Sequence, residues 1–317
     1  MQNVAMPTTR LFSPDSPQAG AINHLFLIVG VIMILILALV TFLVFYAAFR
    51  YRRRPGEGEP PQLFGKKNVE IGWTVAPILL VIFIFVITLR TMHRADPAPA
   101  ADDPPFLVVT AHQWWWEAQY AEPHVITANE IHIPTGKPLL VELKSADVIH
   151  DWWVPQLGRK MDAIPGHPND FWIQADTPGT YLGRCAEYCG AEHAWMRIRV
   201  IAQPQAQFAQ WEQHQLEVPA KPRAEEAAQG EKLFQKQLTC ASCHRVAGTP
   251  AKADIGPDLT HVASRETLAA GRLKNTSANL RKWLANPQAI KPGANMPNFQ
   301  LTENQVDDLA AYLETLK

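Results

Sequence analysis

The chain has few cysteines and almost no net charge. Its 317 residues contain four cysteines, too few for a scaffold held together by disulfides. The 29 basic and 30 acidic side chains nearly cancel, which argues against a nucleic-acid-binding protein because phosphate neutralisation needs clustered lysine and arginine. Charged residues make up only 19% and apolar residues 47% of the chain, which excludes a mostly disordered protein. The cysteines form two close pairs, Cys185/Cys189 and Cys240/Cys243.

Two long uncharged runs stand near the start of the chain. Residues 25–49 and 71–89 contain no charged side chain. At 1.5 Å per residue, each run is long enough as a helix to cross a hydrocarbon core of about 30 Å. Neither run has the polar face that a helix on a soluble core needs. We therefore predict a transmembrane hairpin over residues 1–94, with helices at about 22–49 and 71–90.

Positive charge gathers between the two runs. Residues 50–70 contain six lysines and arginines against three glutamates. The positive-inside rule places this loop in the cytoplasm. Everything after residue 90 is therefore expected outside, in a periplasm-like or extracellular space.

The external part divides into a β-rich and a helical region. Residues 95–105 are rich in proline and alanine, which indicates a stiff linker. In residues 106–202, short apolar runs alternate with turn residues, which predicts a β-sandwich or small barrel. Residues 203–223 look like a tether, and over 224–317 the apolar period becomes helical, with a capping box at 302–305 before the last helix. The runs that predict strands are Phe106–Thr110, Leu139–Leu143, Phe171–Ala175 and Met196–Ile201.

The second cysteine pair has the spacing of a haem attachment site. Cys240 and Cys243 are three residues apart and His244 follows directly, the pattern in which two thiols add to the haem vinyl groups and the histidine lies beneath the iron. Met296, the only methionine after residue 196, suits the other axial position. A redox-active disulfide or half of a zinc site are the other interpretations, but a second CxxC pair is missing.

The first cysteine pair lies among soft donors. Cys185, Cys189, His193 and Met196 place two thiolates, an imidazole and a thioether within twelve residues, a set that favours copper over hard cations. A zinc site completed by an upstream histidine, or a disulfide, also fits the spacing. Zinc rarely takes a thioether, so donor chemistry favours copper while leaving zinc open.

Residues 20–202 resemble cytochrome c oxidase subunit II. The segment Cys185–Met196 has that family's binuclear copper A pattern, CxExCGxxHxxM. Further matching motifs are Asn68–Pro77, His112–Trp116, Ser145–His150 and Lys160–Gly166. The resemblance implies a cupredoxin-like β-sandwich over residues 106–202 that holds two copper ions.

The resemblance also implies a role for each matched position. The implied copper ligands are His150, Cys185, Cys189, His193 and Met196, with the backbone carbonyl of Glu187 as the sixth donor. The Glu187 side chain would reach a magnesium site at the boundary with subunit I. Trp114 would be the residue where electrons arrive, and Glu70 would lie near the mouth of a proton path.

Residues 224–317 resemble a class I cytochrome c. The matching features are the haem motif, Gly256-Pro257-Asp258-Leu259, the methionine loop and the closing helix. This resemblance implies an all-α domain with one haem covalently bound to Cys240 and Cys243, and with His244 and Met296 as axial ligands. The fold class predicted for the chain is therefore multidomain: a transmembrane hairpin, a cupredoxin-like copper domain and a cytochrome c domain.

Together the resemblances imply the subunit through which electrons reach a proton-pumping haem-copper oxidase. Electrons would pass from cytochrome c, including the chain's own haem, through the binuclear copper to subunit I, which reduces oxygen to water. The expected partners are subunits I and III, the lipid bilayer, and a soluble or membrane cytochrome c or an upstream complex as donor. The expected location is the cell inner membrane, with the copper and cytochrome domains in the periplasm. Such a subunit belongs to an oxidoreductase but is not catalytic alone.

Two alternatives follow from the same residues. The module could deliver electrons to another reductase, such as a copper-A nitric oxide reductase, because the acceptor chemistry lies in another chain. A membrane-anchored, zinc-stabilised binding or sensor protein with an appended cytochrome is an alternative of a different class, which metal analysis would distinguish. Quinol oxidase subunits share the hairpin and sandwich but lack the copper ligands, so the intact ligand set argues against quinol as donor.

Overall fold

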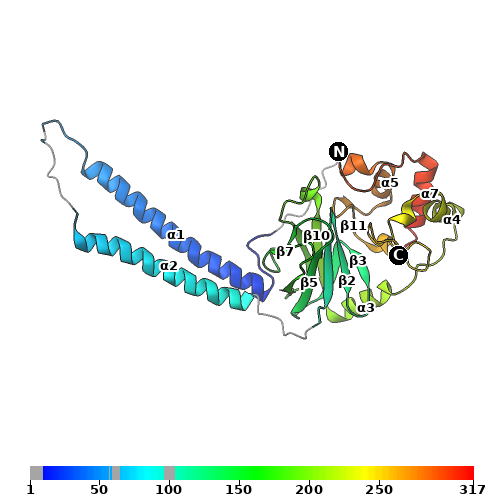
Figure 1. Ribbon diagram of the computed structural model, residues 1–317, viewed down its shortest axis with the longest axis horizontal. Coiled ribbons are helices and arrows are strands. Elements are labelled where there is room, and N and C mark those ends of the chain that lie inside the picture. Colours follow the sequence, from blue (N-terminus) through cyan, green and yellow to red (C-terminus); the bar gives the residue numbers. More distant parts are fainter. Residues whose placement is uncertain (1–9, 57, 59–64, 96–103) are drawn as a thin grey trace. The chain divides into compact units, whose positions relative to one another are not determined.

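The computed structural model describes residues 10–56, 58, 65–95 and 104–317. The chain divides into two compact units, residues 20–97 and a larger unit formed by residues 1–19 with 98–317. Figure 1 shows the order of the elements along the chain. The linker predicted at 95–105 falls largely outside the described residues.

The smaller unit consists of two long helices. Helix α1 spans Pro17–Arg50 and α2 spans Lys67–Ala95, so each extends beyond the apolar run that predicts it into polar flanking residues. Both are long and apolar enough to cross a membrane, and no residue of their most apolar segments is buried within the protein. An apolar surface on all sides of a helix is stable only when lipid or other protein covers it.

The β-rich region folds into two five-stranded sheets. The first has the order β3-β2-β1-β5-β8 and the second β4-β10-β9-β6-β7. The strands of the first sheet are β1 Leu107–His112, β2 Trp115–Tyr120, β3 Ile126–Ala128, β5 Leu139–Ser145 and β8 Asn169–Ile173. Those of the second are β4 Glu130–Pro134, β6 His150–Trp153, β7 Met161–Ala163, β9 Gly179–Cys185 and β10 Arg197–Gln203. The four predicted runs correspond to β1, β5, β8 and β10, and the sandwich fold class is confirmed.

Alternation of side chains places the sandwich core between the sheets. Strands β1 and β10 bury every second residue, as expected when one face of a sheet packs and the other does not. The largest fully buried side chains of this core include Trp116 and Tyr120. Cys185, Cys189 and Met196 belong to the same buried cluster. The soft donors are thus set in the wall of a rigid core.

The predicted tether is partly helical and packed. Helix α3 spans Gln205–Gln215 and buries Phe208 in the sandwich core. The Trp211 ring stacks on His132 of β4 with 4.2 Å between ring centroids. The helix therefore fixes the direction in which the chain leaves the sandwich.

The C-terminal region is mostly helical, as predicted. Its elements are α4 Glu225–Lys232, η2 Leu233–Gln237, η3 Cys240–Ser242, η4 Val262–Ser264, β11 Thr267–Leu268, β12 Leu273–Lys274, α5 Ser277–Ala285, α6 Pro287–Ile290 and α7 Glu303–Leu313. The predicted capping box is present: Thr302 and Gln305 exchange side-chain and backbone hydrogen bonds at the start of α7. Helices α4 and α7 approach so closely that a Cβ atom on Gly230 would lie 1.9 Å from the carbonyl oxygen of Asp308.

Candidate metal centre and haem pocket

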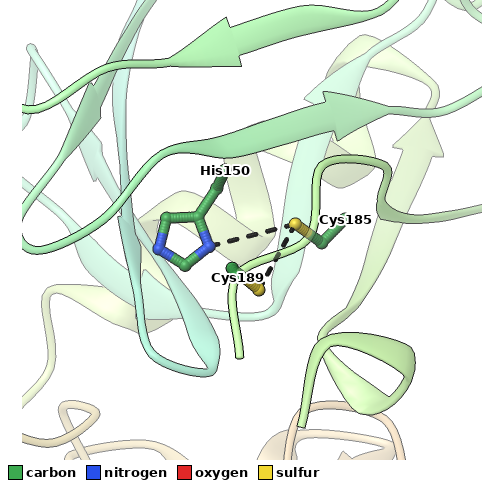
Figure 2. Close-up of side chains that lie close together, drawn as sticks. All are labelled: His150, Cys185 and Cys189. Atoms are coloured by element: carbon green, nitrogen blue, oxygen red, sulfur yellow. Dashed lines mark hydrogen bonds between the residues drawn. The ribbon is translucent and has the colours of Figure 1, made fainter. Parts of the chain in front are cut away.

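Three buried side chains converge beside the second sheet, as Figure 2 shows. His150 begins β6, Cys185 ends β9 and Cys189 lies in the loop that follows, and their ligand atoms all lie within 4.8 Å of one another. Cys185 Sγ is 3.9 Å from His150 Nδ1 and 3.7 Å from Cys189 Sγ. Both cysteines are free thiols, so the disulfide interpretation does not describe this structure.

The remaining predicted donors surround the same two sulfur atoms. Cys189 Sγ lies 3.6 Å from His193 Nδ1 and 3.9 Å from Met196 Sδ. Cys185 Sγ lies 3.2 Å from the carbonyl oxygen of Glu187. The six donors named from the sequence are thus brought together, four of them around the pair of cysteine sulfur atoms.

The loop that carries these donors is closed at its base. Strands β9 and β10 pair antiparallel, and the backbone N–H of Cys185 donates to the carbonyl of Met196 over 3.0 Å. The backbone N–H of Ala186 donates to Asp151 O, which ties the loop to β6. These hydrogen bonds are all within the protein, so the protein itself holds the donor residues in place.

Asp147 orients His150. Its Oδ1 lies 2.8 Å from His150 Nε2, so the other ring nitrogen, Nδ1, faces the sulfur atoms. Burial raises the pKa of Asp147, but hydrogen bonds from His150 and from the backbone N–H groups of Gln113 and Val148 outweigh it, and the pKa is lowered. A carboxylate behind a histidine ligand is a common arrangement in metal sites. In the sequence, Asp147 lies within the matching motif Ser145–His150, and no role could be assigned to it there.

The electrostatics of the sulfur pair suit a metal ion. A hydrogen bond between the two thiols lowers the pKa of Cys185 and raises that of Cys189, because the second thiol stabilises the first thiolate. Burial disfavours a second negative charge at this position. Both sulfurs can be thiolates together only when positive charge binds between them, and soft thiolate, imidazole and thioether ligands suit copper.

Trp114 and Gln113 directly contact the segment Cys185–Met196, called here the metal loop. Trp114 Nε1 and Gln113 Nε2 both donate to the carbonyl oxygen of Cys189, over 2.9 and 2.7 Å. The predicted electron-receiving tryptophan is therefore one hydrogen bond from a cysteine ligand. Gln113 stands in the matching motif His112–Trp116 but was given no role, because its importance comes from the Cys189 carbonyl that it contacts.

The second cysteine pair lines a cavity of about 220 Å³, called here the C-terminal cavity. Cys240, Cys243, His244 and Met296 all contribute to its wall, which is otherwise largely apolar. His244 Nδ1 lies 2.8 Å from the carbonyl oxygen of Pro257, which fixes the ring. A Cβ atom on residue 256 would lie 2.6 Å from His244 Cε1, so the matched glycine lets the imidazole fit. The four haem residues named from the sequence are thus brought together.

The C-terminal cavity also has a wall from the β-sandwich. Gln113, Trp114 and Trp115 line it. Lys291 Nζ donates to the carbonyl oxygen of Trp114, and Asn295 Nδ2 donates to that of Gln113, both over 2.8 Å. The sequence left the placement of the two domains open: Lys291 stands in no motif, and Asn295 lies in the methionine loop but was given no role of its own.

The sequence also assigns roles to the side chains of two glutamates, Glu70 and Glu187. Glu70 lies in the first turn of α2, where its carbonyl accepts a hydrogen bond from Thr74. The exposed Glu187 side chain accepts a hydrogen bond from the backbone N–H of Tyr188. A further carboxylate was missed: burial, together with a hydrogen bond to Asp162, raises the pKa of Asp151 to about 7.

Comparison with known proteins matches the chain in three segments. The family models are "Cytochrome C oxidase subunit II, transmembrane domain" over residues 8–91, "Cytochrome C oxidase subunit II, periplasmic domain" over 122–203, and "Cytochrome c" over 227–317. These families imply copper and haem binding, and the His150, Cys185 and Cys189 group is consistent with the former.

Curated relatives extend over nearly the whole chain. Cytochrome c oxidase subunit 2 of Alkalihalophilus pseudofirmus is 36% identical over 311 residues, covering 96% of this chain and 90% of the relative. Cytochrome c oxidase subunit 2 of Bacillus sp. (strain PS3) is 35% identical over 288 residues, covering 84% and 80%. The crystal structure of the periplasmic domain of subunit II of cytochrome oxidase of Bradyrhizobium japonicum is 32% identical, covers 37% of this chain and 94% of that one, and has a TM-score of 0.34.

These matches agree with the membrane helices, the β-sandwich and the helical C-terminal domain described above. They place the chain in a membrane-anchored oxidoreductase complex, with a domain in the periplasm. The chain belongs to the cytochrome c oxidase subunit II family and carries a cytochrome c domain after its periplasmic domain.

Proposed function

We propose that the chain receives electrons for a proton-pumping haem-copper oxidase. Electrons pass from cytochrome c, including the chain's own haem, through a binuclear copper centre to subunit I, where oxygen is reduced to water. The observation that carries this proposal is the convergence of four further copper-type donors on the Cys185/Cys189 sulfur pair, which makes six in all. A site of this kind transfers electrons and leaves oxygen chemistry to another chain.

Each donor has its own task in holding two copper ions. Cys185 and Cys189 would hold the ions as thiolates, and His150 and His193 would complete the strong ligands. Met196 Sδ and the carbonyl of Glu187 are the weak outer donors. When bound, such a centre accepts and releases one electron. The hydrogen bonds that close the loop keep the donors in place in either redox state, which favours fast electron transfer.

The C-terminal cavity is proposed to hold one covalently bound haem. Cys240 and Cys243 would attach the haem through their thiols, and His244 and Met296 would bind its iron. A hydrogen bond to Pro257 holds the histidine, and Gln288 Nε2 donates to the Met296 carbonyl and so holds the methionine loop. Trp114 is then placed to receive electrons, because it lines this cavity and contacts Cys189.

The proposal includes the setting of these centres. Residues 1–94 form the membrane hairpin, with the 50–70 loop in the cytoplasm, and residues 106–202 and 224–317 are the copper and cytochrome c domains in the periplasm. The membrane is the cell inner membrane. Partners are subunits I and III, the bilayer, and a cytochrome c or upstream complex as donor. The Glu187 side chain contributes to a magnesium site, and Glu70 lies at the mouth of a proton path.

Spectroscopy of the purified oxidase complex tests the proposal. We expect two coppers per chain by metal analysis, the paramagnetic signal of a shared copper pair, one c-type haem by optical absorption, and oxygen consumption with reduced cytochrome c. One zinc per chain in place of two coppers would overturn the copper assignment. Reduction of nitric oxide with no oxygen consumption would reassign the acceptor while keeping the electron-transfer role.

A further inference from the structure

A buried carboxylate, that of Glu130, lies at the contact between the copper and cytochrome c domains. Glu130 begins β4 in the second sheet and is 3% exposed. Its Oε2 accepts a hydrogen bond of 2.9 Å from the backbone N–H of Glu266, and its Oε1 accepts one from the hydroxyl of Thr267. Both donors belong to the cytochrome c domain and lie more than 130 residues away in sequence. No motif on the chain assigns Glu130 a role.

Arg199 pairs with carboxylates of both domains. It lies opposite Glu130 in the parallel pairing of β4 and β10, with 3.6 Å between its Nε and Glu130 Oε1. Its guanidinium also pairs with the carboxylate of Glu266. A carboxylate that is buried needs such partners, because an unpaired charge in the interior is costly. The hydrogen bonds from Glu266 and Thr267 to Glu130, and the pairing of Arg199 with Glu266, form only while the two domains are in contact.

Residues 266–274 of the cytochrome c domain form a hairpin that adds apolar contact. Strands β11 and β12 pair antiparallel around a turn, in which Ala269, Ala270 and Gly271 all have positive φ. Ala270 packs in a small buried cluster with Trp115 and Ala128 of the copper domain. The 266–274 hairpin is thus held to the sandwich at its start by Glu130 and at its turn by Trp115.

A second contact from the hairpin reaches the metal loop. The Arg272 guanidinium lies 3.7 Å from the ring centroid of Trp195, which follows His193 in the loop. On another part of the domain, Lys291 and Asn295 donate to backbone carbonyls next to Trp114. The hairpin and the methionine loop thus both fasten the domain while the C-terminal cavity faces Trp114 and Trp115.

We propose that Glu130 is a positioning residue that fixes the cytochrome c domain on the copper domain with the C-terminal cavity against Trp114. It acts through Glu266 and Thr267, and it touches neither centre. The functional consequence rests on the proposed transfer of electrons from haem to copper. Since electron transfer slows steeply as two centres move apart, a loosened contact lowers that rate and leaves each centre's own spectrum unchanged.

The test uses the complete oxidase with Glu130→Ala, Glu130→Gln and, as a matched control, Glu142→Ala. Glu142 is a carboxylate of the same domain that pairs with Lys144 and lies on β5 in the first sheet, whereas Glu130 lies in the second sheet. The first measurement is hydrogen exchange over residues 262–275. We expect at least tenfold faster exchange in Glu130→Ala, a smaller increase in Glu130→Gln because its amide oxygen still accepts one hydrogen bond, and no change in Glu142→Ala.

The second measurement is the rate of electron transfer from haem to copper after rapid photoreduction of the haem. We expect at least a tenfold fall in Glu130→Ala, partial recovery in Glu130→Gln, and unchanged optical and copper paramagnetic spectra. Wild-type exchange rates in Glu130→Ala, or faster exchange with an unchanged electron-transfer rate, would overturn the positioning role. If Glu130→Ala fails to assemble, Thr267→Val is used in its place, because it removes one of the same hydrogen bonds from the cytochrome c side. The same two measurements then support or overturn the positioning role.

The two proposals fail in distinguishable ways. Absence of haem-to-copper electron transfer in the wild-type complex would contradict the proposed function, while hydrogen exchange would still report whether Glu130 holds the domains together. Normal transfer in the wild type with no effect of Glu130→Ala, Glu130→Gln or Thr267→Val would overturn only the role of Glu130.

Discussion

The metal loop and the C-terminal cavity each contain two cysteines, yet they are built differently. In the metal loop, five of the six donors come from Cys185–Met196 and only His150 is remote. Its sulfur atoms are buried and the surrounding donors already lie within 4 Å of them. In the C-terminal cavity, Cys240 and Met296 are far apart in sequence and line open space. A small ion needs a preformed shell of donors, whereas a large planar group needs a cavity that it fills itself.

This difference predicts how each region responds to loss of its cofactor. The metal loop is held by backbone hydrogen bonds and by the sandwich core, so it should keep its fold without copper. The C-terminal domain has its cavity within its own apolar core and should lose stability without haem.

Cys185→Ala should abolish copper binding and lower oxygen consumption at least a hundredfold, because it removes a bridging thiolate. The haem absorption spectrum should remain, since the C-terminal cavity is untouched. Metal analysis, oxygen uptake and optical spectra of the purified complex measure these effects. Cys243→Ala is the reciprocal variant, expected to disturb the haem and keep the copper signal. Normal turnover by a copper-free Cys185→Ala complex would contradict the proposed route.

Gly230→Ala should destabilise the C-terminal domain by about 3 kcal/mol, since the added methyl would overlap the backbone of Asp308 and force α4 from α7. Thermal unfolding followed through haem absorption measures the loss. The control is Gly158→Ala, whose added Cβ would meet only Gln18 Cβ at 4.0 Å. Equal melting temperatures for Gly230→Ala and the wild type would show that the two helices can move apart freely.

Asp147→Asn should weaken copper binding by about 10- to 100-fold, because the amide orients the His150 ring less well than the carboxylate does. Competition with a copper chelator gives the affinity. The haem spectrum serves as the internal reference and should stay unchanged. An Asp147→Asn protein with wild-type copper affinity would show that His150 is held by packing alone.

A smaller effect is expected from pH at the sandwich. Burial lowers the pKa of His132 to about 4 from an ordinary value near 6.5. Between pH 4 and pH 6.5, the His132 imidazole therefore binds a proton in the unfolded chain but not in the folded chain. The stability that the folded state has with neutral His132 is present above pH 6.5 and is lost as the pH falls toward 4. Between pH 7.5 and pH 5, we expect the free energy of unfolding to fall by an amount on the order of 2 kcal/mol.

Denaturant unfolding of the subunit at pH 7.5 and pH 5, followed through tryptophan fluorescence, measures this loss. His132→Gln should show a weaker dependence on pH than the wild type, and His124→Gln, at an exposed position, should match the wild type. Identical slopes in all three proteins would contradict the assignment to His132.

The metal loop shows how much of the candidate site could be predicted from the sequence. Four donors could be named because they are close together in one segment with characteristic spacing, and the family resemblance added His150 and the Glu187 carbonyl. The four strands with long apolar runs were also predicted. Strand β2 was not, because Trp115–Tyr120 lacks a clear alternation of apolar and polar residues and forms a strand through its pairing with β1. Asp147 lacked an assigned role because its importance comes from the ring that it contacts.

Local chemistry in the sequence determined the two membrane helices, the sandwich, the helical C-terminal region and the residues of both cysteine sites. Periodicity, spacing and capping depend on neighbouring residues, so the sequence displays them directly. The tertiary structure alone decided that Glu130 lies against Glu266 and Thr267, that Lys291 contacts Trp114, and that the C-terminal cavity has a wall from the copper domain. These contacts join residues more than 100 positions apart and depend on the packing of whole domains, which leaves no local signature in the chain.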